Sequence, residues 1–160
     1  MSRRFALGVP LPERARWSVD DARAPWLVAV HPESRSELRL RTWKAARRVL
    51  PSECEAQVRL WRPTLPPIIE ETSILEQRID APPGYVTELH VGVRNAAGGV
   101  EGFAMAFGAT VGRCFCALFT TRASGSEAEQ VLGARLSLLA DGTFPRIVER
   151  TIDDRVDVPH

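Results

Sequence analysis

Apolar and polar residues alternate with a period of two through the middle of the chain. The apolar sets are Leu89, Val91 and Val93, then Phe103, Met105 and Phe107, and then Phe115, Ala117 and Phe119. Because successive side chains of a strand point to opposite faces of a sheet, the pattern predicts three strands. Gly98 with Gly99, and Gly112 with Arg113, mark tight turns between them. Short connections join neighbouring strands, so an antiparallel meander is expected.

Shorter runs in the rest of the chain predict four further strands. They lie at residues 5–9, 26–30, 37–41 and 73–79. The polar break at residues 34–36 favours a hairpin between the second and third of these. From Thr42 the pattern changes, and helix-forming residues predict a helical piece over residues 43–50 that Pro51 interrupts. Ser52, with Glu55 three residues later, matches a capping box and predicts a second helical piece.

The second helical piece would carry Cys54, Val58 and Trp61 along one face. A last helix is predicted after Ser126 and Glu129, another capping-box match, and Gly142 would end it. This order of elements predicts an α+β fold, an antiparallel β-sheet with helices packed on it. The length of 160 residues fits one domain, expected over residues 1–150, with a charged and loosely ordered tail over residues 151–160.

Charge and cysteine content narrow the classes of protein and the compartment. The 21 basic and 20 acidic residues nearly balance, so nothing favours a nucleic-acid partner. No apolar run reaches the roughly 20 residues that a membrane span requires. The start of the chain lacks the apolar segment of a signal peptide, and three cysteines cannot all pair within one molecule. We therefore expect reduced thiols and a cytoplasmic location.

Several segments together carry a family resemblance. They are residues 5–10 with Trp17, residues 26–32, 37–40 and 85–91, and residues 115–121 followed by residues 126–129. In their order these segments resemble the PsbP-like α/β/α sandwich and, within it, the DcrB-related group. The resemblance is one of pattern and spans residues 5–139. It implies a non-enzymatic role, because members act as photosystem II accessory subunits, small-GTPase partners, envelope proteins or chaperones of type VI secretion effectors. It carries over no catalytic residue.

One group of residues could support metal or ligand chemistry. Cys114 and Cys116 share a strand face and could hold a soft metal, with His90 and Glu88 nearby in the pattern. A zinc site needs four ligands and usually a wider cysteine spacing, whereas free cysteine commonly packs as a small buried hydrophobe. Core packing of the cysteines, and a solvated strand face for His90, are therefore favoured. No resident cofactor and no metal is expected.

The tryptophans suggest a protein-binding role. All four fall within the first 61 residues, where they either form an interaction surface or fill the core. Lys44, Arg47 and Arg48 add a small basic patch. The candidate partner-binding residues are Trp26, Trp43, Arg47 and Trp61, together with Phe103, Met105 and Phe107 on the apolar face of the sheet.

These features favour a non-enzymatic adaptor of the bacterial cytoplasm that binds another protein. Its most specific version is a type VI effector chaperone, which predicts an apolar groove and a homodimer. Two alternatives stay open. One is a structural component of a larger assembly, and the other is a small-ligand or metal-binding protein with a deep pocket around His90, Glu88, Cys114 and Cys116.

Overall fold

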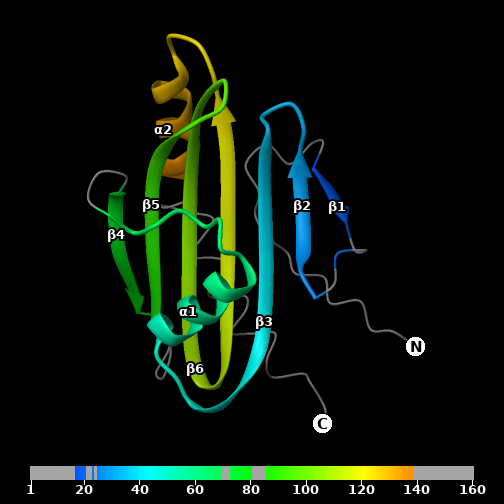
Figure 1. Cartoon of the computed structure of the whole chain (residues 1–160), viewed down its shortest axis with the longest axis vertical. Coiled ribbons are helices and arrows are strands. Elements are labelled where there is room, and N and C mark those ends of the chain that lie inside the picture. The colour runs from blue at the N-terminus through cyan, green and yellow to red at the C-terminus, as the bar shows by residue number, and fades with distance from the viewer. Residues whose placement is uncertain (1–16, 21–22, 24, 70–72, 81–85, 139–160) are drawn as a thin grey trace.

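The fold is an antiparallel sheet with two helices packed against it, as the sequence predicts (Figure 1). The computed structural model describes residues 17–20, 23, 25–69, 73–80 and 86–138. The strands are β1 Ser18–Asp20, β2 Leu27–His31, β3 Ser36–Arg48, β4 Ser73–Asp80, β5 Val86–Ala96 and β6 Gly99–Ala123, and the helices are α1 Pro51–Trp61 and α2 Ala128–Leu138. The sheet order is β1-β2-β3-β6-β5-β4. The strand expected at residues 5–9, the helix stop at Gly142 and the tail over residues 151–160 lie outside the described residues.

The strand β6 is a 25-residue run that folds back on itself. A straight strand would separate residues 21 positions apart by about 70 Å. Yet the Arg122 Nε atom lies 3.0 Å from Glu101 Oε2. The turn falls at Gly112, whose φ of +77° is a left-handed conformation that glycine adopts without strain. Figure 1 shows the two arms of β6 joined at one end of the sheet. The predicted turn at Gly112 is therefore confirmed, and β5 adds the third strand of the meander.

The two arms of β6 have different neighbours. Residues 99–109 pair with β5, from Ala96↔Gly99 to Val86↔Ala109. Residues 111–120 pair with β3, where Leu38 faces Phe119 and Trp43 faces Cys114. The β6 hairpin thus joins the two halves of the sheet.

The strand β3 is much longer than the sequence predicts. Its ladder with β6 continues through Thr42↔Phe115, Trp43↔Cys114 and Lys44↔Arg113 before a register shift leads to Arg48. The helical piece expected over residues 43–50 is therefore wrong. The helix preference of its alanines, lysine and arginines amounts to less than about 1 kcal/mol per residue, and pairing with β6 overrides it.

The helix α1 begins at Pro51 and is not interrupted by it. Proline suits the first helical position, where its missing N–H has no partner to lose. Leu50 is the N-cap residue, and its backbone N–H donates to Glu53 Oε2 at 2.9 Å. The helix expected after Ser52 is confirmed, but its cap lies two residues earlier than the Ser52–Glu55 match predicts.

The two helices pack on opposite faces of β6. Phe103, Met105 and Phe107 point toward α1 and share a cluster with Val58. Ala104 and Ala106 point the other way and share a cluster with Leu136 of α2. The approach of α2 is close, because a Cβ atom at Gly102 would lie 3.1 Å from Leu136 Cδ1. Figure 1 shows α1 near the turn of β6 and α2 near the other end. The small residues of β6 admit a helix.

The β6 fold-back makes a testable packing prediction. A Cβ atom at Gly108 would lie 1.7 Å from Phe115 Cε1 on the facing arm, and that ring is buried. We expect Gly108→Ala to lower the free energy of unfolding by about 1–3 kcal/mol through overpacking. The matched control is Gly133→Ala in α2, where a Cβ meets nothing within 4 Å and which should stabilise by up to about 1 kcal/mol. Urea unfolding measures both, and a Gly108→Ala variant as stable as the wild type would contradict the hairpin packing.

Candidate functional site

Three of the tryptophans meet on the α1 face of the sheet. Trp61 lies at the end of α1, with its ring centroid 4.9 Å from that of Trp43 and 6.4 Å from that of Trp26, both edge to face. All three are partly buried and pack against the cluster around Phe107. They therefore fill the core and also reach the surface.

Two arginines lie against these rings. The Cζ atom of Arg41 lies 3.5 Å from the centroid of Trp61 and 5.5 Å from that of Trp26. The Cζ atom of Arg62 lies 5.9 Å from the centroid of Trp26. Such cation–π contacts contribute about 0.5–2 kcal/mol each, depending on how far the cation is desolvated. We name Trp26, Trp43, Trp61, Arg41 and Arg62 the tryptophan–arginine cluster.

Hydrogen bonding in the tryptophan–arginine cluster is incomplete. The Nε atoms of Arg41 and Arg62 are both buried, and neither has a hydrogen-bond partner in the described part of the chain. A buried donor that loses its partner typically costs about 1–3 kcal/mol, and more when it is charged. The cluster therefore holds two guanidinium groups with unused donor capacity.

Charged neighbours act on Arg62 in opposite directions. Desolvation lowers the pKa of Arg62 most, the charge of Arg39 lowers it further, and Glu37 acts in the opposite direction. Glu37 is itself engaged by Arg39, which donates from Nε to Oε1 and, at 3.0 Å, from Nη2 to Oε2. This leaves Glu37 little capacity to balance Arg62 and Arg41.

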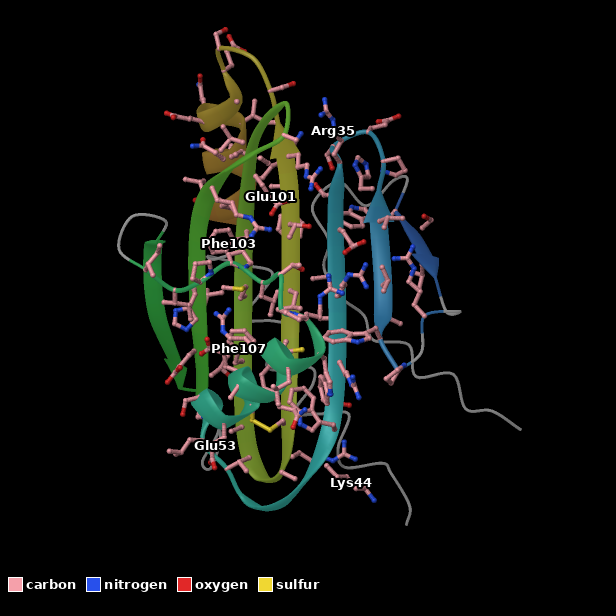
Figure 2. All side chains as sticks on the ribbon, viewed as in Figure 1. Arg35, Lys44, Glu53, Glu101, Phe103 and Phe107 are labelled. Carbon is pink, nitrogen blue, oxygen red and sulfur yellow. A yellow bond between two sulfur atoms is a disulfide. The ribbon has the colours of Figure 1, made fainter. Side chains whose placement is uncertain are left out.

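The apolar residues proposed for partner binding are inside the protein. Phe103, Met105 and Phe107 are at most 2% exposed. Figure 2 labels Phe103 and Phe107 on β6. The sheet face that they form is covered by α1, so any contact with a partner would require that helix to move. Arg47 lies in β3, and its side chain falls outside the described part of the structure.

His90 is buried, whereas a solvated strand face was expected. It lies opposite Met105 in the β5–β6 ladder, on the face that α1 covers, and only 4% of it is exposed. Neither Nδ1 nor Nε2 has a hydrogen-bond partner among the described residues. The Nε2 atom lies 3.9 Å from Glu88 Oε2. Glu55 of α1 joins them, so that one ligand atom from each of the three residues lies within 4.8 Å of the others.

The cysteines correct the expectation of reduced thiols. Cys54 of α1 and Cys114 of β6 form a disulfide, with their Cα atoms 5.6 Å apart (Figure 2). The bridge forms because α1 crosses the β6 hairpin, a proximity that a spacing of 60 residues does not reveal. The Cys114 sulfur is therefore already bonded. The idea that Cys114 and Cys116 act together as two thiolates is wrong.

Cys116 is the remaining cysteine and is buried. Burial raises the pKa of its thiol to about 12, although the charge of Arg41 acts against the shift. The thiol stays protonated near neutral pH, and a protonated thiol is a poor metal ligand and nucleophile. Packing as a small hydrophobe, the favoured interpretation, agrees with its place beside Leu118.

Most buried polar groups elsewhere in the described chain are paired, with Thr87 Oγ1 of β5 as the exception. His31 Nδ1 lies 2.7 Å from Ser34 Oγ, which donates to Ser36 Oγ at 2.7 Å, and Ser36 in turn donates to Thr121. Arg135 of α2 donates to Thr121 Oγ1 at 2.9 Å and to the Ser34 carbonyl at 3.1 Å, and so ties that helix to β6 and to the β2–β3 turn. These bonds have a structural role.

Buried Glu101 is likewise paired, with Arg94 and Arg122. A hollow beside the β5–β6 turn is lined by Arg35, Gly98 and Arg122 among others, and its lining does not include His90. It is therefore not the deep pocket around His90, Glu88 and the cysteines that the ligand-binding alternative predicts.

Comparison with known proteins adds no family assignment. No protein-family model matches the chain, and no curated protein matches it. None of the described helices is long and apolar enough to cross a membrane.

The Cys54–Cys114 disulfide gives a prediction about stability. Closing a loop of 60 residues is expected to stabilise the fold by about 2–4 kcal/mol. Dithiothreitol should lower the urea midpoint of the wild type accordingly. A Cys54→Ala/Cys114→Ala variant is the control, because its midpoint should not respond to the reductant. Equal midpoints for oxidised and reduced wild type would contradict a structural bridge.

Cys116 gives a pH prediction. The folded pKa of about 12 lies above the ordinary value of 9.0, so the folded state holds the proton more tightly. The resulting stability is fully present below pH 9 and is lost as the pH rises from 9 toward 12. We expect the free energy of unfolding of the wild type to fall more steeply over pH 8.5–10.5 than that of Cys116→Ala. Parallel pH profiles would show that Cys116 ionises normally in the folded protein.

Proposed function

We propose that this chain is a non-enzymatic protein-binding module that holds an acidic segment of a partner at the tryptophan–arginine cluster. One observation carries the proposal: the Nε donors of Arg41 and Arg62 are buried beside tryptophan rings and unpaired within the described chain. A partner carboxylate would supply the missing acceptor. An adjustment of the side chains on binding would bring these donors into reach.

The chemistry of the cluster fits such a partner. Tryptophan and arginine are the residues that most often dominate the energetics of protein interfaces. The planar guanidinium group binds carboxylates through two parallel hydrogen bonds, which a lysine cannot reproduce. The guanidinium groups of Arg41 and Arg62, beside a Glu37 carboxylate that Arg39 already engages, favour an acidic segment over a basic one.

The arrangement of helices supports the finer fold proposal. Since α1 and α2 lie on opposite faces of β6, the chain fits the layers of a PsbP-like α/β/α sandwich of the DcrB-related group. The disulfide favours an oxidising compartment, because reducing cytoplasm keeps most thiols free. We therefore propose the bacterial envelope in place of the cytoplasm expected from the sequence. That location weakens the effector-chaperone version relative to an envelope adaptor or a structural component.

Binding of defined acidic peptides tests the function. We expect Asp- and Glu-rich peptides to change the fluorescence of the clustered tryptophans, while Lys-rich peptides of equal length do not. Arg62→Lys keeps the charge but loses the two-pronged hydrogen bonding, and should weaken binding about 10-fold to 100-fold, the equivalent of about 1.5–3 kcal/mol.

Lys44→Ala, which removes an exposed positive charge, is the matched control and should bind within about twofold of the wild type. Thermal melts establish that each variant folds. A loss of affinity in Lys44→Ala with none in Arg62→Lys would reduce the effect to net charge. Peptide binding that Arg62→Lys leaves unchanged would refute the role of the cluster.

A further inference from the structure

We propose that Glu55, Glu88 and His90 form a binding site for a divalent transition metal of the zinc class. The three residues come from two elements that pack face to face, since Glu55 lies on α1 and the other two on β5. One ligand atom of each lies within 4.8 Å of the other two. This site shares no residue with the tryptophan–arginine cluster and does not depend on the protein-binding function.

The state of His90 is the independent observation. The exposed fraction of the residue is only 4%, and neither ring nitrogen has a hydrogen-bond partner in the described chain. A polar group in this state costs about 1–3 kcal/mol relative to a satisfied one. A carboxylate oxygen of Glu55 and one of Glu88 each lie within 4.8 Å of a ring nitrogen. A metal ion would give one nitrogen an electron-pair acceptor and would balance both carboxylate charges.

The donor set selects the kind of metal. Imidazole nitrogen with carboxylate oxygen suits zinc, whose bonds to these atoms are about 2.0–2.2 Å long. Calcium and magnesium prefer oxygen ligands alone, so His90 argues against them. Tetrahedral bonds of that length put ligand atoms roughly 3.3–3.5 Å apart, and the Glu88–His90 pair is already at 3.9 Å. Small rotations of the two glutamates would close the site, and water would fill the fourth position.

One neighbouring cation shapes the site. Arg59 Nε lies 2.8 Å from Glu55 Oε1, and Arg59 Nη1 donates to the Pro66 carbonyl at 3.0 Å. The arginine is thus anchored at both ends and orients the Glu55 carboxylate, while a metal needs only the other oxygen. Such outer contacts commonly fix the direction of a ligand. The charge of Arg59 lowers the affinity for a cation, so moderate binding is expected.

Zinc titration of the 160-residue, disulfide-intact chain tests the site. After EDTA treatment and desalting, isothermal titration with zinc chloride should give one ion per chain, and zinc should raise the thermal midpoint. His90→Gln should abolish both effects. Glu55→Gln and Glu88→Gln should each weaken binding about 10-fold or more, while Glu127→Gln, an exposed glutamate before α2, should not.

X-ray absorption at the zinc edge keeps the test decisive if His90→Gln fails to fold. The wild-type spectrum should fit one nitrogen and otherwise oxygen ligands, with no sulfur. A sulfur shell would assign the zinc to Cys116 or to an opened disulfide and would overturn the proposal. Absence of zinc binding, or binding that both glutamate variants leave unchanged, would overturn it equally.

Discussion

The fold-back of β6 at Gly112 is the constraint on which the rest of the structure depends. It places residues 99–109 against β5 and residues 111–120 against β3, so one hairpin joins both halves of the sheet. It also fixes two unequal faces. Large side chains such as Phe107 point to α1, and small ones such as Ala104 let α2 approach closely. Slipping the pairing by one residue would exchange these sets, which makes the register strongly specified.

The two faces differ in how completely their polar groups are satisfied. Near α2, the chain of hydrogen bonds from His31 through Ser34 to Thr121 ends at Arg135. Near α1, by contrast, His90 and the Nε atoms of Arg41 and Arg62 are buried without a described partner. Folded proteins leave few such groups, because each one opposes folding. Of the five such atoms in the described chain, four lie on the α1 face and one, Thr87 Oγ1, lies on the α2 face. This imbalance is the basis for proposing that the α1 face binds a partner and a metal ion.

Strand periodicity predicted much of the sheet. The alternating runs anticipated β2, β4, β5 and both arms of β6, and the glycine at position 112 marked the turn. The same reasoning failed at residues 43–48, where a helix-forming composition was overridden by pairing with β6. Short β1 has too few residues to give a periodic signal.

The sites were harder to predict, because their residues meet only when α1 crosses the hairpin. The Cys54–Cys114 bridge and the approach of Glu55 to His90 both depend on that crossing, and neither leaves a mark in the spacing of the sequence. His90 and Glu88 were noticed from their shared strand face. Trp26, Trp43 and Trp61 were identified as candidates, but the stacked position of Arg41 was not. Local pattern finds the members of an element, whereas contact between elements requires the fold.

The central claim is that the sheet face covered by α1 binds a metal ion and a partner, whereas the face covered by α2 stabilises the fold. Methyl NMR tests it most directly, because β6 carries a reporter for each face. Met105 points to α1 and lies opposite His90 in the ladder, whereas Ala104 and Ala106 point to the α2 side. The account predicts that zinc, and separately an acidic peptide, will shift the NMR signals of methyl groups on the α1 face. For zinc the largest shift should be that of Met105. The signals of Ala104 and Ala106 should hardly shift in either titration. Larger shifts at the two alanines than at Met105, or no shift on either face, would contradict it.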